Sequence, residues 1–119
     1  MANKKNNLNL IDVKYTKLAY EQALINLGST AINPSVGCVV VKNNSVISSG
    51  HTSFNGRPHA ENNALKKKIN FKDSNLYVSL EPCSHYGKTP PCTDLIIKKK
   101  IKRVVFSITD SDPRSKKKA

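Results

Sequence analysis

The chain has 119 residues, of which 20 are Lys or Arg and 8 are Asp or Glu, so its formal net charge at pH 7 is +12. This length allows one domain at most, and no apolar run approaches the length of a membrane span. The polar start lacks the apolar core of a secretion signal, and three cysteines do not suggest a disulfide framework, so we expect a cytoplasmic protein. The charge favours an anionic partner, either a phosphorylated small molecule or nucleic acid, although lysine runs are also typical of solvated surfaces.

The first half of the chain predicts a helix followed by a hairpin. Residues 1–11 are expected to form a loose N-terminal segment, after which Asp12 can cap a helix that runs to about Leu27, with Gly28 as its stop. One apolar face is expected on this helix, formed by Tyr20, Ala23, Leu24 and Leu27. The β-branched run 36–41 and the segment 45–51 predict two antiparallel strands joined by a turn at Asn43-Asn44. Cys38 is expected to be a small buried core residue of the first strand.

The second half predicts alternating helices and strands. Pro58 suits the first position of a helix that extends to Lys68. A strand over 76–80, a helix over 91–100 and a strand over 102–109 are expected to follow. Strand–helix–strand units require crossovers, which give parallel pairing with helices that cover the sheet. We therefore expect an α/β domain over residues 12–112, with a polar basic tail at 113–119 that marks a truncation point.

The chemistry centres on His59-Ala60-Glu61, Cys83 and Cys92. One imidazole and two thiolates can bind a zinc ion, and a catalytic zinc site typically leaves its fourth position to water. Pro58 and Pro91 should place the histidine and Cys92 in first helical turns, where the positive partial charge favours a thiolate. Glu61 is then free to act as base and afterwards as acid. This combination of His-x-Glu, Pro-Cys and a second Cys is typical of zinc deaminases, so we predict a hydrolytic deaminase that uses Zn²⁺.

Two alternatives stay open. His85 could be a fourth ligand of a structural zinc site, and the chain would then be a zinc-stabilised, non-enzymatic module that binds RNA or protein. Against this, the eight residues between Cys83 and Cys92 are long for a zinc finger. The second alternative is a deaminase of nucleosides, nucleotides or tRNA bases, which the positive charge favours. However, a flipped base needs aromatic stacking partners, and the chain has no Trp.

Four longer segments resemble the cytidine-deaminase-like superfamily, and within it the riboflavin-biosynthesis pyrimidine deaminases (diaminohydroxyphosphoribosylaminopyrimidine deaminases). They are residues 33–41, 50–51, 59–61 and 80–92. The loop Pro-Cys-Ser-His-Tyr-Gly-Lys-Thr-Pro-Pro-Cys is the feature that distinguishes this group from its relatives. The similarity covers roughly residues 13–112.

The resemblance implies a three-layer α/β/α sandwich with a mixed sheet, here of four strands where the family has five. It implies deamination of 2,5-diamino-6-(5-phosphoribosylamino)pyrimidin-4(3H)-one, with His59, Cys83 and Cys92 on zinc and Glu61 as the proton shuttle. Substrate-pocket residues of the family correspond to Asn33, His51, His85 and Lys88. A cation suits a phosphate, although the family usually has Arg at the lysine position. The asparagine could instead hold a turn, the two histidines could be packing residues, and the lysine could be solvated.

The resemblance also bears on partners. Family chains continue past the fourth strand with another helix and a fifth strand, and many with an NADPH-dependent reductase domain. A sheet of four strands would leave an unpaired edge. We therefore expect either a longer chain or a homo-oligomer that covers this edge. The expected partner is a phosphorylated pyrimidine, with no membrane and with nucleic acid disfavoured.

Overall fold

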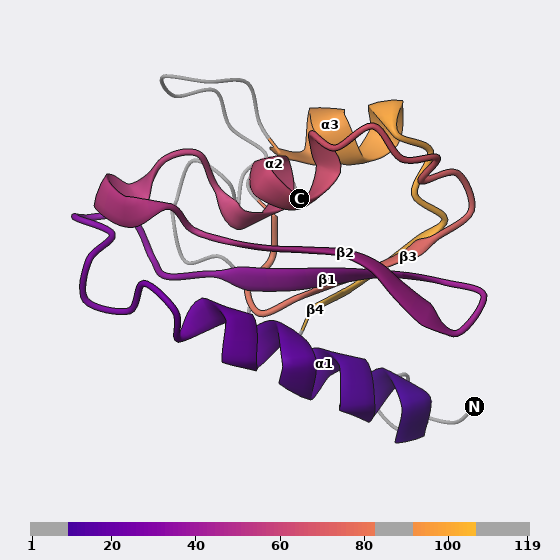
Figure 1. Ribbon diagram of the computed structural model, residues 1–119, viewed down its shortest axis with the longest axis horizontal. Helices are drawn as coiled ribbons and strands as arrows, with labels where there is room; N and C mark the ends of the chain where they lie inside the picture. The colour runs from indigo at the N-terminus through magenta and orange to yellow at the C-terminus, as the bar shows by residue number, and fades with distance from the viewer. Residues whose placement is uncertain (1–9, 83–91, 107–119) are drawn as a thin grey trace, which may run out of the picture.

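The computed structural model describes residues 10–82 and 92–106 (Figure 1). Its elements are α1 (Leu10–Ala23), β1 (Gly37–Lys42), β2 (Ser45–His51), the 3-10 helix η2 (Phe54–Gly56), α2 (Ala60–Leu65), β3 (Asn75–Val78), α3 (Cys92–Lys98) and β4 (Arg103–Phe106). The order of helix, hairpin, helix, strand, helix and strand is the predicted one. Residues 10 and 11 belong to α1 rather than to a loose segment, and the predicted tail at 113–119 lies outside the described residues. No described helix is long and apolar enough to span a bilayer.

The four strands form one mixed sheet in the order β2-β1-β3-β4. Strand β1 pairs antiparallel with β2 on one side and with β3 on the other. The helix α3 connects β3 to β4, and these two strands are parallel, as a crossover connection requires. Asn43 and Asn44 both have positive φ angles of 51° and 63°, so they form the tight turn that the sequence predicts between β1 and β2.

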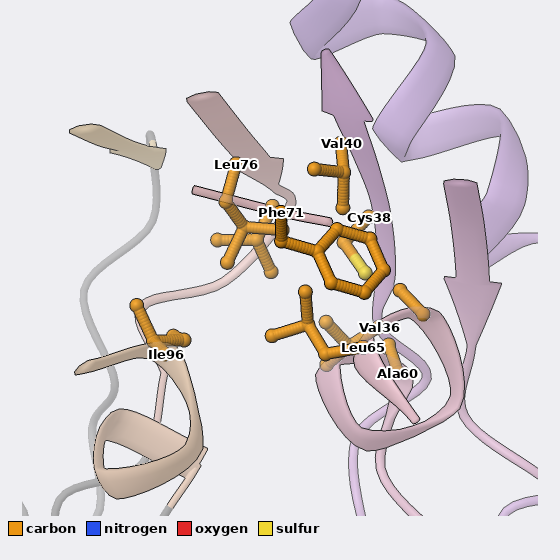
Figure 2. Packing of buried hydrophobic residues seen from close by; sticks show 10 residues of the cluster. Val36, Cys38, Val40, Ala60, Leu65, Phe71, Leu76 and Ile96 are labelled. Carbon is orange, nitrogen blue, oxygen red and sulfur yellow. The ribbon is translucent and has the colours of Figure 1, made fainter. Parts of the chain in front are cut away.

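Helices cover both faces of the sheet, with α1 on one face and α2 and α3 on the other (Figure 1). Successive strand residues point to opposite faces, so β1 contributes to two cores. Val39 and Val41 pack with Tyr15 and Tyr77 beneath α1. The other core lies under α2 and α3 (Figure 2), and includes Val36, Cys38, Val40, Leu65, Phe71, Leu76 and Ile96. The predicted α/β/α sandwich with a mixed four-stranded sheet is confirmed.

The prediction for Cys38 as a core residue is also confirmed. Its side chain is completely buried among the apolar residues under α2. Burial raises the pKa of the thiol well above its usual value, and the carboxylate of Glu61 raises it further. The thiol therefore stays protonated and behaves as a small apolar group.

The predicted apolar face of α1 was right at Ala23 and wrong at its three large residues. The helix buries Asp12, Tyr15, Ala19 and Ala23, whereas Tyr20, Leu24 and Leu27 are exposed. The reason is the close approach of α1 to β1 at Gly37, where an added Cβ would collide with the carbonyl oxygen of Ala19 and the backbone nitrogen of Ala23. Only small side chains fit between the two backbones at this contact. The helix also ends at Ala23, four residues before the predicted end.

The predicted capping role of Asp12 was wrong as well. Asp12 is the third residue of α1 and is buried against the sheet. The hydroxyl of Tyr77 donates to its Oδ1 at 2.5 Å, and Arg103 donates to its two oxygens at 2.9 and 2.6 Å. The carboxylate therefore ties α1 to β3 and β4. A local capping rule cannot detect partners that lie 65 and 91 residues further along the chain.

Candidate active site

Two predicted zinc ligands meet at the starts of two helices. His59 is the N-cap of α2, and Cys92 is the first residue of α3. These helices lie on the same face of the sheet and pack against each other (Figure 1). As a result, Nδ1 of His59 and Sγ of Cys92 lie 3.5 Å apart, although 33 positions separate the two residues in the sequence.

This distance can be compared with the geometry of a zinc site. Zinc binds nitrogen at about 2.0–2.1 Å and sulfur at about 2.3 Å with tetrahedral angles, which places the two donor atoms about 3.6 Å apart. The observed 3.5 Å between Nδ1 and Sγ is close to this separation, and it is also within hydrogen-bonding distance for a thiol and an imidazole. The third predicted ligand, Cys83, lies outside the described residues. Accordingly, residues 10–82 and 92–106 contain no group of three metal-binding side chains.

The start of α2 differs from the prediction. Pro58 was expected at the first helical position, but α2 begins at Ala60, and the Arg57-Pro58 peptide bond is cis. His59 has an extended backbone with φ −70° and ψ 164°, so it lies before the first helical turn. A two-residue separation within a helix would direct the histidine and Glu61 about 200° apart. Because His59 is outside the helix, this restriction does not apply to the pair.

Glu61 is the second residue of α2, and only 4% of its surface is exposed. Its charge raises the pKa of the buried thiol of Cys38 in the core under α2. The helix itself lies directly on β2 at Gly50, where an added Cβ would collide with the carbonyl oxygen of Ala60 and lie 2.7 Å from the backbone nitrogen of Ala64. This contact sets the height of the first turn of α2 above the sheet.

Asn33 lies in the loop before β1 and is half-buried. Its Nδ2 donates to the carbonyl oxygen of Gly56 at 2.9 Å, and its own carbonyl accepts from the hydroxyl of Thr30 at 2.6 Å. Gly56 has a φ angle of +92°, which favours glycine at this turn. The turn-holding role considered for Asn33 is therefore present, and it joins the loop before β1 to η2.

The other predicted substrate residues divide into two groups. His51 is the last residue of β2, is half-buried, and pairs with Gly37 at the start of β1. His85 and Lys88 lie outside the described residues. The structure thus brings His59 and Cys92 together, with Glu61 on the same helix start and His51 at the end of the neighbouring strand.

Sequence reasoning missed two polar residues that hold this end of the sheet. Thr52 is buried, and its hydroxyl accepts from the backbone nitrogen of Val36 at 2.8 Å and donates to the carbonyl of Pro34 at 3.2 Å. Asn63 on α2 donates to the carbonyl of His51 at 2.8 Å. An Asn in the middle of a helix disfavours the helix, and this is the only local sign that Asn63 has a specific partner.

The comparison with known families agrees with this geometry. Residues 11–108 match the family described as the cytidine and deoxycytidylate deaminase zinc-binding region. The chain belongs to this family. It is 45% identical over 104 residues to the diaminohydroxyphosphoribosylamino-pyrimidine deaminase of Buchnera aphidicola, a match that covers 87% of this chain and 71% of that protein. The predicted membership of the riboflavin-biosynthesis pyrimidine deaminases is confirmed.

Longer relatives and solved structures support the same assignment. The riboflavin biosynthesis protein RibD of Aquifex aeolicus is 48% identical over 104 residues, which are 87% of this chain but 29% of that protein. The crystal structure of a Thermotoga maritima deaminase/reductase is 45% identical, with a TM-score of 0.83 over 88% of this chain and 31% of that one. A cyanophage dCMP deaminase shares the fold at 25% identity and a TM-score of 0.64. The chain thus spans less than a third of the length of the RibD protein and of the deaminase/reductase.

Proposed function

We propose that this chain is a zinc-dependent deaminase of riboflavin biosynthesis. Its substrate would be 2,5-diamino-6-(5-phosphoribosylamino)pyrimidin-4(3H)-one, and its products the corresponding 5-aminouracil and ammonia. The observation that carries the proposal is the 3.5 Å approach of His59 Nδ1 to Cys92 Sγ in a chain that belongs to this deaminase family. Residues 12–112 would form the deaminase unit, and a reductase that follows it in a longer chain stays a prediction.

His59, Cys83 and Cys92 are the residues that would hold the zinc ion. The donor set of one imidazole and two thiolates suits zinc. When bound, zinc lowers the pKa of a coordinated water to about 7, which makes a nucleophile available at neutral pH.

Glu61 would move the protons of the reaction. Its carboxylate takes a proton from the attacking water and delivers it to the ring nitrogen. It then takes the second proton from the same oxygen and delivers it to the leaving amine, so that the C–N bond breaks, ammonia departs and a carbonyl remains. A single carboxylate can serve both steps because it is deprotonated again after each transfer. The burial of Glu61 supports this role, since a carboxylate with 4% exposure exchanges protons with bulk water less readily.

The substrate would be oriented by Asn33, His51, His85 and Lys88. A lysine on the loop between the two cysteines suits the ribose phosphate. The bond from Asn33 to Gly56 supports a fixed position for this side chain in the loop before β1. His51 ends β2 next to the segment that leads to His59, which is consistent with a role at the pocket wall.

The variant Glu61→Gln tests the mechanism, with Glu21→Gln on the exposed side of α1 as the matched control. We expect Glu61→Gln to bind zinc as the wild type does but to release ammonia at least about 100-fold more slowly. The control should retain full activity. The measurement is ammonia release from the diaminopyrimidine phosphate, with zinc content determined for each protein. Wild-type turnover in Glu61→Gln would refute the role of the carboxylate.

A substrate panel tests the substrate class. Cytidine, dCMP and tRNA are compared with the diaminopyrimidine phosphate under the same conditions. We expect turnover of the diaminopyrimidine alone. Preferred turnover of dCMP or tRNA would instead assign the chain to the nucleotide or base deaminases of the superfamily. Zinc binding without turnover of any of them would favour the non-enzymatic module.

A further inference from the structure

One amide on α2 holds the segment that carries two of the predicted site residues. The Nδ2 atom of Asn63 lies 2.8 Å from the carbonyl oxygen of His51, 2.8 Å from Oγ of Ser53 and 3.4 Å from the carbonyl oxygen of Pro58. These acceptors lie at both ends of the segment that leaves β2 and returns to α2. The hydrogen bonds of this side chain therefore join the two ends of the segment to α2.

These hydrogen bonds lie next to the predicted zinc ligand His59. Pro58 immediately precedes His59, and the backbone nitrogen of Asn63 donates to the carbonyl of His59 at 3.0 Å. The backbone nitrogen of Ser53 donates to the carbonyl of Pro58 at 3.1 Å, which braces the same segment from within. The bond to the carbonyl of His59 is a backbone bond of α2, which any residue at position 63 would make. The side chain of Asn63 adds a restraint on the segment that precedes His59.

The identity of the side chain matters for this role. The two hydrogens of Nδ2 serve the two closest partners, the carbonyl oxygen of His51 and Oγ of Ser53, and the carbonyl oxygen of Pro58 at 3.4 Å can share one of them. Both carbonyl oxygens can only accept. An aspartate of the same size would present an acceptor to these oxygens and repel them. An alanine would leave the acceptors without the donor.

We propose that Asn63 is a positioning residue for zinc binding. By holding the segment 51–58 against α2, it sets Nδ1 of His59 at the distance from Cys92 Sγ that a shared zinc ion requires. This inference rests on the proposed function for its metal, but it concerns the geometry of the ligand rather than the substrate. Supporting residues around metal ligands typically contribute about 10–100-fold to metal affinity when they are removed.

The test measures metal binding by the full chain in the variant Asn63→Ala. Zinc affinity is determined by competition with a chromophoric chelator, and the ligand geometry by the absorption of the cobalt-substituted protein. We expect the zinc affinity of Asn63→Ala to fall about 10–100-fold and the cobalt spectrum to change. With the diaminopyrimidine phosphate, kcat should fall more than KM changes. Asn63→Asp should show the same losses, and it takes the place of Asn63→Ala should that variant not fold.

Two controls separate positioning from a general loss of stability. Asn62→Ala changes the neighbouring amide on the same helix and should leave zinc affinity within about twofold of the wild type. Val105→Ala removes core packing on the α1 face of the sheet, away from α2 and α3, and should leave the cobalt spectrum unchanged. Wild-type zinc affinity and an unchanged spectrum in Asn63→Ala or Asn63→Asp would overturn the inference.

The outcomes also distinguish this inference from the proposed function. A wild-type protein that binds zinc but releases no ammonia would refute the function, and the zinc affinity of Asn63→Ala would still decide the positioning role. Conversely, an active wild type with a fully active Asn63→Ala variant would refute the positioning role alone.

Discussion

Removing Arg103 from its ion pair with Asp12 should destabilise the fold more than neutralising Asp12. The side chain of Asp12 is 2% exposed, whereas that of Arg103 is 42% exposed. The variant Arg103→Met keeps the apolar part of the side chain but removes the guanidinium from a buried carboxylate that still accepts from Tyr77. Asp12→Asn instead leaves a guanidinium that water can reach, next to an amide oxygen that still accepts from Tyr77.

The expected magnitudes follow from this difference in burial. Breaking a buried ion pair from one side costs about 3–5 kcal/mol, and the half-exposed arginine places this pair at the lower end, so Arg103→Met should cost about 3 kcal/mol. Asp12→Asn loses the charge on its hydrogen bonds but keeps acceptors, which should cost about 1–2 kcal/mol. Thermal unfolding should then occur about 10 °C lower in Arg103→Met.

Urea unfolding at pH 7, followed by circular dichroism, measures both free energies. The double variant is the control, because Arg103→Met should cost less when Asp12 no longer carries a charge. An Arg103→Met cost equal to or smaller than that of Asp12→Asn would contradict the reasoning. So would an Arg103→Met cost that is the same in both backgrounds, since the carboxylate would then not be the source of the loss.

Three further predictions concern single side chains. Burial and a hydrogen bond to the carboxylate of Asp12 raise the pKa of Tyr77 to about 12. The protonated hydroxyl therefore contributes its full stabilisation below pH 10 and loses it as the pH rises through 12. Over this range the unfolding free energy of the wild type should fall relative to that of Tyr77→Phe. Gly50→Ala forces a methyl group against the carbonyl of Ala60 and should lower the free energy of unfolding in urea by about 3 kcal/mol. Gly28→Ala is the control: it has open space but a φ of +88°, and it should lower this free energy by about 1 kcal/mol. The thiol of Cys38 should resist iodoacetamide at pH 8 in the folded protein, and mass spectrometry of its peptide would reveal modification at the rate of a free thiol if this is wrong.

The sheet was predictable where the signal is local. The run of β-branched residues in β1 and the Asn43-Asn44 turn predicted a hairpin, and β2 has the predicted bounds. The hydrophobic pattern fails to predict the buried face of α1, because the sheet surface that the helix packs on decides which residues are buried. Around α1, the absence of a side chain at Gly37 selects alanines for the buried face, although the large apolar residues suggest another face. Helical periodicity describes one helix at a time and carries no information about the surface that it meets.

In the candidate site, the side chains that would bind the metal or move protons were predictable, whereas the side chains that hold them in place were not. Imidazole, thiol and carboxylate are rare chemical types whose spacing is visible in a sequence, so the order of residues along the chain was enough to propose His59, Glu61 and Cys92. Asn63 and Thr52 act on carbonyl oxygens and backbone nitrogens, which nearly every residue possesses. Because any residue type can supply a backbone carbonyl, the sequence does not reveal which residue accepts such a bond. A residue that positions a metal-binding side chain is therefore harder to predict than that side chain, even where the two are as close in the sequence as Asn63 and His59.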